Sequence, residues 1–258
     1  MANPALSNNP AFRRNSTVTA ASLEDLYNRP AADPADLGRM TYQDTAVKTV
    51  ALFAVLLVTG VVGWMVPALA IVGAIGGFVL ALVNTFKREP SVPLIVAYAA
   101  LEGLFVGGIT AIFERLYPGV AIQAVVATLV TVAVTLALFA SGKIRASARA
   151  TKIFMIAIIA YSVFRLVELG IQLFGGTNSA FGISSSVTLF GIPLGLIVGL
   201  LAVVLAAYSL VLDFDQIQQG VRRGLPAKYG WTGAFGLMVT IVWLYVEFLR
   251  IFAILNRR

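Results

Sequence analysis

The sequence contains neither cysteine nor histidine. Without cysteine the chain has no disulfide framework, no thiolate nucleophile and no cysteine-based metal site, and its redox compartment stays open. Without histidine it lacks the side chain that most often changes charge near neutral pH. A pH response would therefore need a carboxylate that burial or a neighbouring like charge shifts toward neutrality.

Charged residues are also scarce, at 12% of the chain, whereas hydrophobic residues make up 59%. A soluble domain carries about a quarter charged residues, and its core could not contain this apolar surplus, so much of the apolar surface is expected to face lipid. The net charge of +7 does not indicate nucleic-acid binding. The basic residues instead lie in short segments between apolar runs, where membrane topology places them.

Seven apolar stretches follow one another, each about 20 residues long, which is the length that crosses a hydrocarbon core of about 30 Å. Spanning segments must be helical, because lipid offers no hydrogen-bond partners to the backbone. We therefore predict an all-α transmembrane domain at 45–258, with spans at about 46–66, 67–86, 93–113, 120–140, 153–174, 187–214 and 230–255.

The first 44 residues are polar and lack the apolar core of a signal peptide, so they are predicted to form a disordered cytoplasmic tail. The segment 175–186, rich in glycine, serine and asparagine, is predicted to be an exposed loop.

Basic residues gather in the tail and after the second, fourth and sixth spans, whereas the opposite loops hold Arg115 alone. The positive-inside rule then places the N-terminus in the cytoplasm and the protein in the cell membrane. Seven crossings put Arg257 and Arg258 outside, unless the last segment is re-entrant; we favour a full crossing.

Glycines recur at intervals of four residues within several spans, a spacing that lets helix backbones approach closely and predicts packing seams. They are Gly73 with Gly77, Gly103 with Gly107, and Gly191 with Gly195 and Gly199. No glycine-rich turn is followed by the lysine and serine or threonine of a phosphate-binding loop.

Ionisable residues inside the spans carry the functional interest, because each costs about 2.5–3.5 kcal/mol at the bilayer centre and needs a partner or water. Arg165 and Glu168 share a helix face, as an ion pair or as a charged lining of a pathway. Glu247 has the same spacing to Arg250, near enough to the outer surface to snorkel. Glu102, without a local basic partner, is a protonated structural acid or a pathway group.

Asp213 and Asp215 lie near the cytoplasmic end of the sixth span and point about 200° apart, so they cannot share one site. One is predicted to face the bundle and the other the headgroups. The Asp213 face also carries Ser209, Gln216 and Ile217 at helical spacing. This polar stripe is either a solvated helix end or, as we favour, a gate or cation site.

Three stretches resemble the Bax inhibitor-1 (transmembrane Bax inhibitor motif) family, bacterial branch. The first runs from Glu102 to Ile109 and continues in 124–139, the second is 212–217, and the third is 244–255. The similarity extends over about 40–258. It implies a central seventh helix ringed by six others, and a calcium leak whose rate depends on pH.

In that family a pair of aspartates on helices six and seven senses pH, and a basic residue at the end of helix two latches onto the first of them. By resemblance Asp213 is the helix-six aspartate, and Lys87 or Arg88 is the latch. Thr240 stands where the second aspartate would be. This departure leaves three alternatives. Burial alone tunes the protonation of Asp213, a glutamate (Glu102, Glu168 or Glu247) takes the place of the missing aspartate, or the pH response is weak.

The leading hypothesis is therefore a pH-sensitive calcium or cation leak channel gated near Asp213, with no enzymatic activity, no cofactor and no assigned metal ligands. The alternative is a non-conducting membrane protein that binds other membrane proteins, such as a membrane protease. An intramembrane aspartyl hydrolase needs two facing carboxylates and is disfavoured. A transporter with inverted repeats is disfavoured too, because no matching halves with broken helices are visible.

Overall fold

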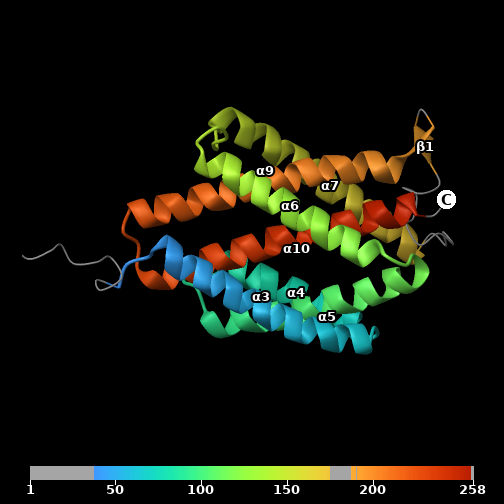
Figure 1. Ribbon diagram of the computed structural model, residues 1–258, viewed down its shortest axis with the longest axis horizontal. Helices are drawn as coiled ribbons and strands as arrows, with labels where there is room; N and C mark the ends of the chain where they lie inside the picture. Colours follow the sequence, from blue (N-terminus) through green and yellow to red (C-terminus); the bar gives the residue numbers. More distant parts are fainter. Residues whose placement is uncertain (1–37, 175–186, 190, 257–258) are drawn as a thin grey trace, which may run out of the picture.

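The computed structural model describes residues 38–174, 187–189 and 191–256. Within these residues it confirms the all-α prediction, with seven helices long and apolar enough to cross a membrane (Figure 1). They are α3 (Tyr42–Met65), α4 (Leu69–Phe86), α5 (Val92–Leu116), α6 (Val120–Ala140), α7 (Ala148–Phe174), α9 (Leu194–Arg222) and α10 (Gly230–Leu255). Most of the predicted tail and the predicted loop 175–186 lie outside the described residues.

The last part of the predicted tail, residues 38–44, is folded. Thr41 caps α3, since its Oγ1 accepts the N–H of Asp44 at 3.0 Å, and Met40 is buried. The N–H of Met40 donates to the carbonyl of Leu225 at 2.7 Å. The disordered tail therefore cannot extend to residue 44, because this segment is fastened to the loop between α9 and α10.

The predicted bounds of the sixth span, 187–214, are wrong at both ends. A short hairpin, β1 (Thr188–Leu189) and β2 (Ile192–Pro193), precedes α9, which begins at Leu194. Gly191 has φ +78° and no neighbour within 4 Å of a built Cβ, so it serves this turn and not a helix seam. At its other end α9 runs to Arg222, eight residues beyond the predicted end. Its polar last turns stay helical because side chains four apart hydrogen-bond one another.

Close packing of α3 and α4 against α5 depends on glycine, as predicted. A Cβ at Gly107 would lie 1.9 Å from the carbonyl oxygen of Gly60, and one at Gly73 would lie 2.5 Å from that of Leu101. The backbones of α3 and α4 therefore lie so close to that of α5 that a methyl group at either position would clash.

The last helix, α10, packs against α3, α5, α6 and α9 and has the largest buried share of the seven spans, 44%. α4 packs mainly on α5, and α7 mainly on α9. A ring of six helices around α10 therefore stays a prediction. α10 is one continuous helix of 26 residues that ends at the opposite end of the bundle from its start (Figure 1), which has the length of a full crossing.

The end of the bundle where α3 and α10 begin is called the basic end here. It comprises residues 38–41 and the connections 87–91, 141–147 and 223–229. That this end faces the cytoplasm stays a prediction. Outside the helix contacts, valine, leucine, isoleucine and phenylalanine side chains are widely exposed on α3, α4, α6 and α7, as expected of surfaces that lie in lipid.

Candidate functional site between α9 and α10

Asp213 projects from α9 toward α10. Its Oδ2 accepts a hydrogen bond of 2.7 Å from the Thr240 hydroxyl, and the Ser209 hydroxyl lies 3.3 Å from that hydroxyl. Thr240 is 4% exposed. A Cβ at Gly236 would lie 3.2 Å from Asp213 Oδ1, so this glycine makes room for the carboxylate. The structure thus brings Asp213 together with the residue that stands in place of the second aspartate.

A cavity of about 160 Å³ lies beside Asp213 at the basic end. Gln216 and Ile217 of the predicted polar stripe line it together with Asp213, whereas Ser209 lies beside Thr240. The other lining residues were not predicted, because most of them come from the folded end of the tail, the connection after α9 and the start of α10. They are Met40, Gly220, Leu225, Tyr229, Thr232, Gly233 and Gly236.

Asp215 points away from this cavity. Its Oδ2 accepts a hydrogen bond of 2.6 Å from Gln219 Nε2, and Gln219 Oε1 accepts one of 3.1 Å from Arg223. Asp213 therefore faces the bundle and Asp215 the outer side of α9, as their spacing predicted. The two carboxylates form no common site.

An apolar layer follows Asp213 toward the opposite end. Ala206 of α9 and Leu244 of α10 are fully buried in one cluster with Leu210. Partly buried Trp243 packs against this cluster and also pairs with Tyr161 of α7, with ring centroids 5.6 Å apart.

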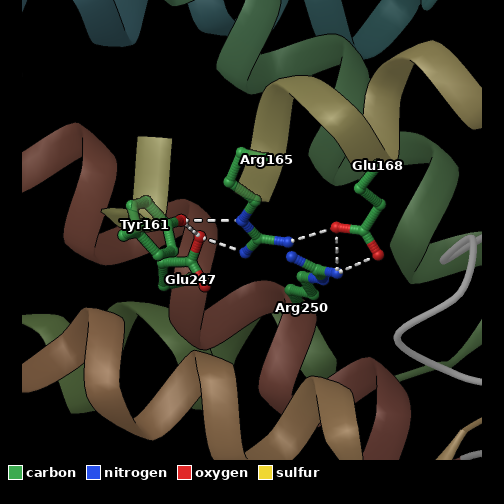
Figure 2. A network of polar contacts seen from close by, with 5 residues as sticks. All are labelled: Tyr161, Arg165, Glu168, Glu247 and Arg250. Atoms are coloured by element: carbon green, nitrogen blue, oxygen red, sulfur yellow. Dashed lines mark hydrogen bonds and ion pairs between the residues drawn. The ribbon is translucent and has the colours of Figure 1, made fainter. Parts of the chain in front are cut away.

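Beyond that layer, α7 and α10 are joined by a network of four charged side chains and a tyrosine (Figure 2). Arg165 donates to Glu247 Oε1 at 2.6 Å and to Glu168 Oε2 at 2.9 Å. Arg250 reaches Glu168 Oε2 at 3.1 Å, and the Tyr161 hydroxyl donates to Glu247 Oε1. Two of the three ion pairs therefore cross between α7 and α10, and the third lies within α7.

The prediction that Glu247 and Arg250 snorkel to the surface is wrong. Glu247 is 3% exposed, and its Oε2 is buried without a hydrogen-bond partner among the described residues. Arg250 pairs with Glu168 on α7 and not with Glu247. The pair of Arg165 and Glu168 within α7 is present as predicted. Tyr161 was missed, although its position one turn before Arg165 was a signal that could have suggested it.

Glu102 lies apart from both polar groups. It faces α4, since a Cβ at Gly77 would lie 2.9 Å from Glu102 Oε2. Tyr98, one turn earlier on α5, is its side-chain partner. This arrangement favours the structural interpretation of Glu102, with the Tyr98 hydroxyl as its partner.

Lys87 and Arg88 are exposed at the end of α4, and in the described part of the chain no hydrogen bond or ion pair links either of them to Asp213. The neighbouring Glu89 instead pairs with Lys228 at 2.9 Å. The latch predicted from the resemblance is therefore not made in this conformation. The described residues also contain no group of three acidic side chains that could hold a metal ion.

Seven helices of spanning length, with buried ionisable groups along their contacts, define a multi-pass helical membrane protein. A family model described as Bax inhibitor 1 like matches residues 3–257, almost the whole chain. The chain therefore belongs to the Bax inhibitor 1 like family. A search of curated proteins found no match.

Proposed function

We propose that the protein is a pH-sensitive leak channel for calcium or other cations, with Asp213 as the group that attracts the ion and regulates its passage. One observation carries the proposal. A partly buried carboxylate lines a cavity at the basic end and accepts, in the part of the chain that the structure describes, one hydrogen bond from α10, that of Thr240. A carboxylate at the entrance of a pathway attracts cations electrostatically.

The contact between α9 and α10 supplies a route for the ion. Gly236, Thr240 and Glu247 lie along one side of α10, and the first two contact Asp213. Glu247 lies seven residues after Thr240, a rise of about 10 Å, and its Oε2 is 3.9 Å from a Cβ built at Gly199 of α9. Two polar levels thus face the same helix contact, separated by the apolar layer of Ala206 and Leu244. The described conformation is closed, and conduction requires α9 and α10 to separate at this layer.

Protonation of Asp213 gives the channel its pH dependence. An ionised Asp213 accepts the Thr240 hydrogen bond and attracts a cation, whereas a protonated one has no charge to offer. Tyr229 is the other ionisable residue that lines the cavity, and Ser209 and Thr240 are the polar neighbours of the carboxylate. Cation flux is therefore expected to fall as pH is lowered through the protonation of Asp213.

The test is calcium entry into proteoliposomes that contain the full chain. Asp213→Asn should reduce the flux by tenfold or more, whereas Asp215→Asn, two residues away on the outer side of α9, should leave it near the wild-type rate. Equal effects of the two variants would contradict a pathway at Asp213. Absence of flux in a folded wild-type protein would contradict the channel proposal and favour the non-conducting alternative, in which the protein binds other membrane proteins.

We also propose that the protein is not an enzyme. Asp213 and Asp215 point apart, and a hydrolase of the aspartyl type needs two carboxylates at one site. A lack of proteolysis of unfolded membrane substrates by purified protein that retains its flux would support this proposal.

A further inference from the structure

A second cavity, of about 460 Å³, lies at the basic end, where the start of α3 meets the end of α9. Arg39, Arg222 and Arg223 line it, together with the first residues of α3 and the end of α9. No acidic side chain is among the lining residues that the structure describes. The full lining is Arg39, Met40, Thr41, Tyr42, Val221, Arg222, Arg223 and Gly224. It is called the arginine pocket below.

The wall of the arginine pocket is built by backbone pairing and does not depend on surface side chains alone. Arg39 and Pro226 form an antiparallel bridge, flanked by hydrogen bonds from Met40 to Leu225 and from Ala227 to Gly38, of 2.7 and 2.8 Å. Gly224 adopts φ +63°, and the Arg39 side chain crosses it, with Cδ 3.5 Å from a built Cβ. The fold thus holds Arg39 against the end of α9.

The three guanidinium groups have no carboxylate partner among the described residues. Arg223 donates to the neutral side chain of Gln219, while the nearby Asp215 and Asp44 already hold other partners, Gln219 and Lys48. The backbone N–H groups of Tyr42 and Gln43 also have no acceptor in the described part of the chain. The start of a helix favours an anion, and guanidinium groups bind phosphate in pairs of parallel hydrogen bonds.

The position of the pocket identifies the source of the phosphate. α3 becomes apolar immediately after it, and Val47 and Val50 are 63% and 69% exposed, as on a surface that lies in lipid. Tyr42, which is 52% exposed, lines the pocket at the start of this surface, and aromatic residues of this kind mark the membrane interface. A phosphate that binds beside this apolar surface is therefore expected to belong to a phospholipid headgroup.

We propose that the arginine pocket binds the phosphate of an anionic phospholipid headgroup. The headgroup lies between Arg39 and the arginines that end α9, at the start of α3, while the acyl chains follow the exposed side of α3. This site is separate from the Asp213 cavity, and its occupation does not require that the protein conducts ions.

The test counts bound lipid on the full-length protein in non-ionic detergent by native mass spectrometry. The probes are short-chain phosphatidylglycerol and, for comparison, phosphatidylcholine of the same chain length. We expect the wild type to bind phosphatidylglycerol more tightly. Each removed arginine should weaken that binding about fivefold, so that the double change Arg222→Gln with Arg223→Gln weakens it about 25-fold.

The matched control is the double change Lys143→Gln with Arg145→Gln, which removes the same charge from an exposed loop at the same end but outside the pocket. It should retain wild-type binding, and Arg222→Lys with Arg223→Lys should recover most of what the glutamine pair loses. Equal losses in the pocket and control pairs would overturn the proposal in favour of diffuse attraction to the basic end. So would equal affinity of the wild type for the two lipids. Displacement of the lipid by millimolar inorganic phosphate would assign the pocket to a soluble phosphate and overturn the lipid source.

Discussion

At the scale of single residues, the hydrogen bond between Asp213 and Thr240 joins α9 to α10 where related proteins are expected to hold two aspartates. A hydroxyl group donates to an ionised carboxylate but cannot share its proton with it. A second carboxylate at 2.7 Å could share one, because two such groups cannot both be ionised cheaply. The two pairs should therefore respond to pH in different ranges.

Thr240→Asp is expected to move the midpoint of the flux-versus-pH curve upward by about one pH unit or more, since the new pair retains a proton to higher pH. The measurement is calcium flux into proteoliposomes at a series of pH values. Thr240→Asn, which is polar but does not titrate, should leave the midpoint near that of the wild type. An unchanged midpoint in Thr240→Asp would contradict the pairing of residues 213 and 240.

The network of Arg165 and Glu247 gives a second prediction. Removal of one partner from a buried ion pair costs about 3–5 kcal/mol, because the other charge is left buried without compensation. Arg165→Gln should therefore lower the midpoint temperature of unfolding in detergent substantially. Lys152→Gln, exposed on the same helix, should change stability by less than about 0.5 kcal/mol.

The double variant Arg165→Gln with Glu247→Gln tests the cause of that loss. It should recover part of the stability, since no unpaired charge remains between the helices. The contrary result is additivity. If the double variant loses the sum of the stabilities lost by Arg165→Gln and by Glu247→Gln separately, the two residues are not coupled.

Residue spacing within one helix predicted the pair of Arg165 and Glu168 but failed for Glu247 and Arg250, because contacts between helices cannot be read from it. The divergence of Asp213 and Asp215 follows from helical geometry and was predicted. The crossing of Glu168 to Arg250 was not, because the sequence does not say that α7 lies beside α10. Thr240 was placed by resemblance, and the structure gives it a contact with Asp213.

At the scale of helices, the contact of α3 with α5 depends on glycine in a way that can be tested directly. Gly107→Ala should destabilise the protein by about 3 kcal/mol or more, because its methyl group would meet the Gly60 carbonyl oxygen at 1.9 Å. Gly170→Ala is the matched control on α7. A Cβ there has no neighbour within 4 Å, and alanine should stabilise the helix by about 0.5–1 kcal/mol.

The comparison uses the midpoint temperature of unfolding of both variants in the same detergent. A lowered midpoint for Gly107→Ala with an unchanged or raised one for Gly170→Ala is the expected result. Equal shifts would mean that the backbones of α3 and α5 have room for a methyl group, contrary to the described packing.

Hydropathy predicted where the helices cross but not how α9 begins and ends. α6 and α10 were predicted with their observed bounds, since apolar runs coincide with those helices. The hairpin before α9 is as apolar as a helix start, so composition alone could not reveal it. The polar end of α9 continues past the lipid as a helix through local side-chain hydrogen bonds, a stabilisation that hydropathy does not measure.

At the scale of the whole molecule, the predicted orientation can be tested by cysteine labelling. No native cysteine has to be removed first, because the chain has none. Lys143→Cys lies at the basic end and Pro118→Cys in the opposite connection between α5 and α6, and both positions are exposed. With the basic end in the cytoplasm, a membrane-impermeant maleimide should label Pro118→Cys in intact cells and Lys143→Cys only after permeabilisation. The reverse pattern would invert the topology.

The arrangement of the molecule places two of its three polar regions at the basic end and the third toward the opposite end. The arginine pocket and the Asp213 cavity share Met40 as a lining residue at the basic end, and the ion-pair network joins α7 to α10 toward the opposite end. A pathway along α10 would therefore meet Asp213 first, then the apolar layer, and then Glu247. The central claim is that the first of these groups controls the passage of ions.

That claim is tested most directly by calcium flux into proteoliposomes from pH 6 to pH 8, for the wild type and for Asp213→Asn. The account predicts a wild-type flux that falls as pH is lowered, and a small flux in Asp213→Asn that does not change with pH. A wild-type pH dependence that persists in Asp213→Asn, or a flux that the substitution leaves intact, would contradict the account and remove Asp213 from the pathway.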